Sequence, residues 1–202
     1  MPRWLSADPL VLGSASKIRQ KLLVSAGIPI EIDAADIDER AVEACAPSQS
    51  PGAVAALLAR EKAIAVAGRK PGRLVLGADQ VLALGARRFT KAADRAAART
   101  QLQALRGQTH ELHSAVAVMK DATVLFEHVG VARLTMRPFS DHFLDHYLDE
   151  VGSAATASVG AYQLESLGIQ LFDRIEGDYF TILGLPLIAL LDFLRRHGCL
   201  AA

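Results

Sequence analysis

Serines and cations gather where an apolar segment passes into a helical pattern, in LVLGSASKIRQKLL at residues 10–23. Free backbone N–H groups and the positive dipole at a helix start attract anions. Ser14 and Ser16 would add hydroxyl donors, and the Arg19 guanidinium would bind two phosphate oxygens at once. The pattern indicates a phosphate site, but a plain helix cap at Ser16 and a solvated Arg19 fit it equally well.

Carboxylates suited to metal or base chemistry occur in two places. Asp36, Asp38 and Glu39 lie close together in DIDER, where they would bind a hard divalent cation or form a solvated turn. Asp79 follows the apolar run RLVLG, and we expect it at the carboxyl end of a strand. Partial desolvation there would raise its basicity and suit it to activating water or holding a metal. A buried Asp79 that caps the next turn is the alternative.

Two lysines are candidates for the same anion. Lys62 lies near the apolar face of an Ala-rich helical segment, and its long stem would let the ammonium reach water along that face. Lys91 stands just before another predicted helix. Both positions are compatible with phosphate binding and with simple exposure to solvent.

The elements that must position these residues follow from turn signals and periodicity, and they alternate between strand and helix. The sequence predicts a strand at 10–12, a helix at 17–26, an extended segment at 28–40, a helix at 51–67, a strand at 73–85 with a polar break at Asp79 and Gln80, and a helix at 92–105.

The second half of the chain predicts an antiparallel hairpin within residues 110–139 that reverses near 120–122. Ser140 should cap a short helix, residues 160–185 read as a Gly-rich extended region, and Pro186 should begin a closing helix. The predicted fold is therefore α/β with a mixed sheet, in a single domain over residues 1–202 without a separate linker.

Composition limits the partners. Lys plus Arg and Asp plus Glu both number 22, so no long-range positive field favours nucleic acid or an anionic membrane. Cys45 and Cys199 have no CxxC spacing and suggest reduced cysteines in a reducing compartment. With no signal-peptide pattern and no long apolar run, we expect a cytoplasmic protein.

The order of these motifs makes the chain similar to a known family. SASKIR, DER, REKA, GADQV, TKAADRA, GAYQLESLGIQLFDRIEGD and ILGLPL resemble, in this order, the motifs of the Maf family of nucleoside triphosphate pyrophosphatases, over about residues 9–197. The resemblance implies a two-lobed fold of the inosine-triphosphate-pyrophosphatase type. It also implies a nucleotide cleft between the lobes, a divalent metal such as Mg²⁺, Mn²⁺ or Co²⁺, and a possible homodimer.

The resemblance also implies roles for individual residues. Asp79 matches the family's catalytic acid and, together with Glu39, would hold the metal. The phosphate-contacting positions are matched by Ser14, Arg19, Lys62 and Lys91. The expected reaction cleaves between the α and β phosphates, giving a nucleoside monophosphate and pyrophosphate.

Departures from the family pattern concern the substrate. Where many members read SxSPRR this chain has Ile18 before Arg19, and Ala92 replaces the usual Pro after the second lysine. Gln80 and Glu165 replace the Thr and late Gln of many members, which resembles the branch that acts on 7-methyl-GTP and would make both residues substrate-binding. An enzyme for dTTP and UTP, and a nucleotide-sensing regulator of septum formation with little turnover, are the alternatives.

Overall fold

The computed structural model describes residues 3–45 and 49–201. The chain divides into two compact units, the first formed by Met1–Gln80, Ser114–Gly130 and Asp178–Ala202, and the second by Val81–His113 and Val131–Gly177. The chain passes between them along three long strands, so β3, β5 and β6 contribute residues to both units. The single domain, and the nucleotide cleft implied by the family resemblance, remain predictions.

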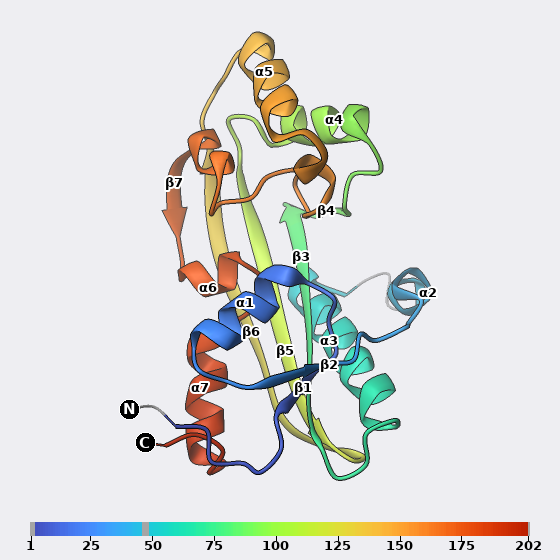
Figure 1. Cartoon of the computed structure of the whole chain (residues 1–202). Helices are drawn as coiled ribbons and strands as arrows, with labels where there is room; N and C mark the ends of the chain where they lie inside the picture. Colours follow the sequence, from blue (N-terminus) through green and yellow to red (C-terminus); the bar gives the residue numbers. More distant parts are fainter. Residues whose placement is uncertain (1–2, 46–48, 202) are drawn as a thin grey trace. The chain divides into compact units, whose positions relative to one another are not determined.

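The first half of the described chain runs in the order β1-α1-β2-α2-α3-β3-β4-α4, so strands and helices alternate except at α2–α3 and β3–β4 (Figure 1). The strands are β1 (Leu10–Leu12), β2 (Ile30–Ile32), β3 (Leu74–Leu84), β4 (Arg87–Phe89), β5 (Thr109–Lys120), β6 (Thr123–Met136) and β7 (Phe172–Glu176). The helices are α1 (Lys17–Ser25), α2 (Glu39–Ala44), α3 (Pro51–Ala67), α4 (Arg95–Leu105), α5 (Asp141–Val151), α6 (Tyr179–Ile182) and α7 (Leu187–Arg196), with 3₁₀ turns η1 (Gly152–Thr156) and η2 (Leu167–Leu171).

The strands form one seven-stranded sheet of order β2-β1-β3-β5-β6-β7, with β4 paired to β3. Strand β1 is parallel to both β2 and β3, while the β3–β4 and β6–β7 pairs are antiparallel. The sheet is therefore mixed, and the predicted α/β class is confirmed.

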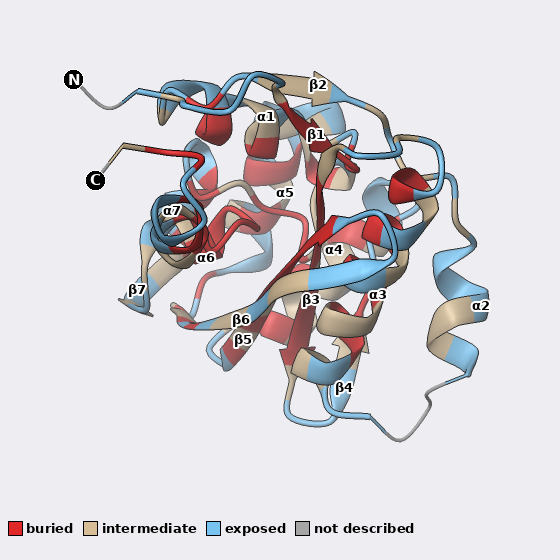
Figure 2. Cartoon of the chain, turned by 90° about the horizontal axis from the view of Figure 1, so that it is seen from below, coloured by how far each residue is buried: buried red, intermediate tan, exposed pale blue. Residues whose placement is uncertain are grey.

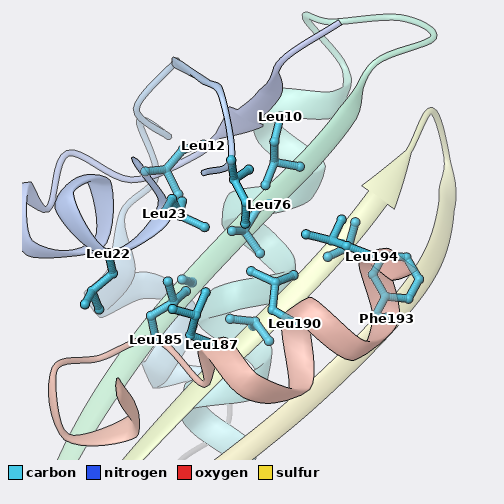
Figure 3. Close-up of a cluster of buried hydrophobic side chains, with 14 of the residues drawn as sticks. Leu10, Leu12, Leu22, Leu23, Leu76, Leu185, Leu187, Leu190, Phe193 and Leu194 are labelled. Carbon is cyan, nitrogen blue, oxygen red and sulfur yellow. The ribbon is translucent and has the colours of Figure 1, made fainter. Parts of the chain in front are cut away.

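A leucine-rich cluster holds the first unit together (Figure 3). Leu10, Leu12 and Leu76 extend from β1 and β3, and they pack with side chains of α1 and α7 such as Leu23 and Leu190. All five are essentially inaccessible to solvent, and Figure 2 shows β1 buried along its whole length. Because burial of one such side chain contributes about 1.5–3 kcal/mol, this cluster fixes helix α1 against β1 and β3.

Alternation along β3 sends neighbouring residues to opposite faces. Leu76 and Ala78 belong to the leucine-rich cluster, whereas Gly77 meets α3. A Cβ atom on Gly77 would lie 2.0 Å from the carbonyl oxygen of Ala59 and 2.7 Å from the backbone nitrogen of Ala63. Only glycine permits this approach, which brings the backbone of β3 directly against α3.

Several predicted boundaries are confirmed. Helix α1 has Ser16 at its N-cap, and Gly27, with φ of 75°, follows its C-terminal end. Helix α3 runs from Pro51 to its C-cap at Gly68, and the hairpin β5–β6 turns at residues 121–122. The side chain of Ser140 accepts a bond from the backbone N–H of Phe143 and caps α5 as predicted.

Three predictions about local structure are wrong. Strand β3 does not break at Asp79 and Gln80, because both polar side chains find partners on either side of the sheet. Helix α4 begins at Arg95 rather than at residue 92, since Asp94 caps it through the N–H of Ala97. The region 160–185 is not simply extended, because it contains η2, β7 and α6.

No helix in residues 3–45 and 49–201 is long and apolar enough to cross a membrane. Both cysteines are unpaired, as predicted; Cys199 is buried, whereas Cys45 is exposed.

Candidate active site

A buried ion pair between Lys62 and Asp79 is the centre of the candidate site. The Lys62 Nζ donates to Asp79 Oδ1 at 2.6 Å, and the two side chains are only 11% and 10% exposed. Since Asp79 follows Gly77 by two residues, it shares the face of β3 that lies against α3. The close approach at Gly77 thus brings the carboxylate within reach of the helix.

Lys62 occupies the buried face of α3, where Leu58 and Val66 stand one turn before and after it. The prediction that its stem carries the ammonium into water along this face is wrong, because the ammonium is held by Asp79 instead. An ammonium away from water requires a charged partner, and here it has more than one.

Glu39 supplies the second carboxylate. It is the first residue of α2, its side chain is 52% exposed, and its Oε1 lies 2.6 Å from Lys62 Nζ. The other acidic residues of this loop serve differently: Asp38 caps α2 by accepting from the N–H of Ala41, and Asp36 is exposed. Of the three predicted carboxylates, Glu39 is therefore the one that joins the site.

Arg19 lies beneath the strand-to-helix turn rather than in solvent. Its Nε donates to the carbonyl of Gly184 at 2.8 Å, and its Nη1 donates to Ser14 Oγ at 3.0 Å and to the carbonyl of Ala78 at 2.9 Å. These bonds use three of the five guanidinium N–H groups. The two on Nη2 have no acceptor among the described residues, so they are the ones that could meet a phosphate.

The turn that precedes α1 leaves further donors for an anion. Ser14 Oγ accepts from Arg19 and from the backbone N–H of Ser16, so its own hydroxyl proton is not used in these bonds. Ser16 sits at the N-cap, yet within the described chain its side chain makes no capping bond, and no acidic residue occupies the first helical turn. Ser16 therefore occupies the predicted cap position without closing it through its side chain, and its hydroxyl stays available to an anion.

Burial sets the electrostatics of the cluster. Desolvation raises the pKa of the Asp79 carboxyl above its usual value, against the opposing effect of Lys62 and Arg19, which stabilise the anion. Desolvation also lowers the pKa of the Arg19 guanidinium, opposed by Asp79 and Glu39. Among the described residues, seven polar or charged side chains are buried, and four of them are Ser14, Arg19, Lys62 and Asp79. Such a concentration of desolvated charge is typical of functional sites.

Gln80 faces away from Asp79, on the opposite side of β3. Its Nε2 donates to Ser114 Oγ at 2.9 Å and lies 3.2 and 2.9 Å from the carbonyl oxygens of Thr181 and Ile182. The amide nitrogen is thus committed to holding α6 against the sheet. Its carbonyl oxygen accepts no hydrogen bond from the described residues, so it could still receive a donor from a ligand.

Lys91 and Glu165 belong to the second unit. Lys91 is exposed and forms an isolated antiparallel bridge with Val159, four residues before α4 begins. Glu165 is exposed in the turn that leads into η2. Their membership of the site remains a prediction.

Sequence reasoning missed the residues that support the turn bearing Glu165. Tyr162 is buried, and its hydroxyl lies 2.7 Å from Nε2 of the fully buried His110. Burial lowers the pKa of His110 to about 4, so the imidazole is neutral at physiological pH. The preceding Ala161 has φ of 61°, a conformation that L-residues rarely adopt. The alternating pattern of HELHSAV contained the signal, because it places His110 on the buried face with Leu112.

The donor chemistry fits a hard divalent cation. Glu39 and Asp79 converge on one ammonium, which shows that their oxygens reach a common point of positive charge. Mg²⁺ is commonly held by one or two carboxylates together with substrate phosphates and water. Among the described residues no group of three or more His, Cys, Asp or Glu could hold a metal by itself, so phosphate oxygens would have to complete such a site.

The fold and the site together define a mixed α/β protein in which the buried charges of Arg19, Lys62 and Asp79, with the half-exposed Glu39, lie near the start of α1. The chain belongs to the family described as Maf-like protein, which matches residues 9–197. A protein of Rhodopseudomonas palustris (strain ATCC BAA-98 / CGA009) named nucleoside triphosphate pyrophosphatase is 57% identical over 201 residues, covering 100% of both chains. A protein of the same name from Nitrobacter winogradskyi is 53% identical, with 100% of both chains covered. Another of this name, from Paramagnetospirillum magneticum, is 52% identical over 93% of this chain and 98% of its own length.

Proposed function

We propose that this chain is a metal-dependent nucleoside triphosphate pyrophosphatase that hydrolyses the α–β phosphoanhydride bond. The observation that carries the proposal is the buried Lys62–Asp79 pair with Arg19 and Ser14 beside it. A desolvated carboxylate next to buried cations is suited to accept a proton from water while the cations attract phosphate. The names of the full-length relatives support the same reaction class.

In the proposed mechanism Asp79 accepts a proton from water as the water oxygen attacks the α phosphorus. The bond from the α phosphorus to the bridging oxygen breaks, and its electron pair leaves with pyrophosphate. Nη2 of Arg19, the hydroxyl of Ser14 and the ammonium of Lys62 would stabilise the departing negative charge. Lys91 is proposed to contact the same phosphates.

Glu39 and Asp79 would hold a divalent cation, which when bound would neutralise phosphate charge and polarise the bond to be cleaved. In this structure the two carboxylates share the Lys62 ammonium. Triphosphate offers Lys62 an alternative anion, and transfer of the ammonium to phosphate would free both carboxylates. We therefore propose that metal enters together with the nucleotide rather than before it.

The proposed substrate is a modified guanine nucleotide such as 7-methyl-GTP. Glu165 is exposed, and a carboxylate accepts two N–H donors at once, as the ring N–H and the exocyclic amine of guanine present them. Methylation at N7 adds positive charge to the ring, which would strengthen the hold of a nearby carboxylate. The free carbonyl oxygen of Gln80 is a second candidate acceptor.

The proposal is tested by hydrolysis of 7-methyl-GTP, GTP, dTTP and UTP with Mg²⁺, Mn²⁺ or Co²⁺, measuring pyrophosphate. We expect the highest kcat/KM for 7-methyl-GTP, and Glu165→Gln should narrow its lead by about 1–3 kcal/mol, as expected when a hydrogen-bonded charge is lost. Glu150→Gln, an exposed glutamate of α5, is the matched control. If dTTP or UTP is the best substrate, the pyrimidine alternative replaces the guanine proposal; tight nucleotide binding without turnover would favour the septum-regulator alternative.

Two further parts of the proposal concern the setting of the protein. The pair of unpaired cysteines supports a reducing compartment, and we propose the cytoplasm. There the enzyme would clear modified nucleotides from the pool. The homodimer and the absence of a nucleic-acid partner remain predictions.

A further inference from the structure

Two histidines lie one turn apart on the solvent side of α5, in the sequence HFLDH at residues 142–146. His142 and His146 are both exposed, and their ring centroids are 4.5 Å apart with an edge-to-face angle of 85°. The buried side chains of this helix are Leu144, Tyr147 and Leu148, which face the other way. The packing of α5 therefore leaves the imidazole pair uncovered.

The three aspartates of the same helix are already engaged with the α4 segment. Four ion pairs join α5 to α4 and its C-cap residue: Arg106–Asp141 at 2.7 Å, Arg99–Asp141 at 3.5 Å, Arg99–Asp145 at 2.7 Å and Arg95–Asp149 at 2.5 Å. By contrast, neither His142 nor His146 makes a hydrogen bond or ion pair with the described residues. The aspartates anchor the helix, and the imidazoles have no structural task of their own.

Imidazoles at positions i and i+4 of a helix project side by side and can bind one metal ion, as they do in helical zinc motifs. Neutral imidazole suits Zn²⁺, Cu²⁺, Ni²⁺ and Co²⁺ rather than Mg²⁺ or Ca²⁺. No group of three or more metal-binding residues is present in residues 3–45 and 49–201, so water would fill the remaining coordination positions.

We propose that His142 and His146 form a surface chelate for a first-row transition-metal ion. Its ligands are nitrogen atoms on one helix of the second unit, whereas the candidate catalytic cation would bind oxygen atoms of Glu39 and Asp79 in the first unit. The two sites therefore select different classes of ion. The chelate does not rest on the proposed pyrophosphatase function.

Calorimetric titration of the full-length, EDTA-treated protein with Ni²⁺ in the absence of nucleotide tests the chelate directly. We expect one site for Ni²⁺, stronger binding of Cu²⁺, and no heat at this site from Mg²⁺. Loss of an outer-shell partner typically weakens metal binding about 10–100-fold, so loss of a direct ligand in His142→Ala or His146→Ala should weaken it at least tenfold. The matched control is His128→Ala, an exposed histidine of β6, which should leave Ni²⁺ binding unchanged.

Two further measurements separate the chelate from adventitious binding. Ni²⁺ should raise the Tm of the unaltered protein but not that of the His142→Gln/His146→Gln double variant, in which glutamine preserves the helix. Electron paramagnetic resonance of bound Cu²⁺ should show coupling to two imidazole nitrogens. Unchanged Ni²⁺ affinity in the double variant, or an equal loss in His128→Ala, would overturn the proposal.

Discussion

Replacing Asp79 with Asn removes one charge from the candidate site while keeping the shape of the side chain. In the folded protein this carboxylate is 10% exposed and accepts from the Lys62 ammonium at 2.6 Å. Proton transfer by a positioned base contributes typically 10²–10⁴-fold to an enzymatic rate. Turnover of Asp79→Asn should therefore fall by about 100-fold or more, which corresponds to about 2.7 kcal/mol of transition-state stabilisation.

The effect of Asp79→Asn on stability at neutral pH should be limited by the groups that remain around Lys62. At an effective dielectric constant of 20, the attraction between charges 2.6 Å apart is about 6 kcal/mol. Removing each ion from water costs several kcal/mol, so the buried pair comes close to breaking even. Asparagine still offers Lys62 a carbonyl oxygen, and Glu39 remains beside the ammonium. Removal of one partner costs about 3–5 kcal/mol when the other charge is left unpaired, so with this compensation we expect the free energy of unfolding to fall by less than about 3 kcal/mol.

The pH dependence gives the sharper test. Burial raises the pKa of Asp79 above the reference value of 3.8, so between the two values the folded protein binds more protons than the unfolded chain. Its contribution to stability therefore falls as pH rises through that window. Asparagine does not titrate, so Asp79→Asn should become more stable relative to the unaltered protein as pH rises from 3.8 to the pKa of Asp79 in the folded protein. The expected gain is about 1.4 kcal/mol for each pH unit within this window.

Urea unfolding of both proteins across this pH range, without nucleotide or metal, measures the difference. Steady-state release of pyrophosphate from the same preparations measures turnover. Near-normal turnover in a folded Asp79→Asn protein would refute its role as the base. If the variant instead loses relative stability as pH rises, the ion pair outweighs desolvation, and Asp79 is a structural anion rather than a destabilised base.

Three further predictions concern other positions. In urea unfolding, Gly77→Ala should lower the free energy of unfolding by about 3 kcal/mol or more, because the new Cβ would meet the Ala59 carbonyl at 2.0 Å. The control Gly68→Ala should be almost neutral, because the nearest contact of its Cβ would be at 3.7 Å. Gln80→Glu should lower the free energy of unfolding by about 1–3 kcal/mol in the same assay, since it removes the amide donors and points a carboxylate at acceptor oxygens. Unchanged stability would contradict the hydrogen bonds described for Gln80. Lys91→Ala should weaken triphosphate binding more than monophosphate binding, and equal weakening would place this lysine away from the phosphates.

The order of motifs along the sequence predicted most of the residues that the structure gathers in the first unit. Ser14, Arg19, Lys62 and Asp79 are drawn from three separate segments, and all four are buried. Strand-to-helix turns and helix caps are local signals, so the start of α1 and both ends of α3 could be predicted with little error.

The sequence could not predict the contacts that depend on long-range packing. From the local sequence alone, Lys62 is expected at the surface. Its burial depends on the close approach of β3 to α3 at Gly77, which is a long-range contact. The polar pair Asp79 and Gln80 reads as a strand break, because the partners that satisfy it, Lys62 and Ser114, lie 17 and 34 residues away. Local propensity contains no information about either partner.

The alternation along β3 makes the spacing of this strand a determinant of the site. Asp79 and Gln80 are neighbours in sequence, yet one meets the ammonium on α3 and the other holds the backbone at residues 181–182. Deletion of one residue between Leu74 and Ala78 would invert the strand, because each following side chain would change face. Gln80 would then oppose Lys62, and the Asp79 carboxylate would move to the position of Ala78, inside the leucine-rich cluster. A one-residue deletion or insertion within β3 should therefore abolish activity, whereas a substitution at a residue of β3 that does not contact the site can be tolerated.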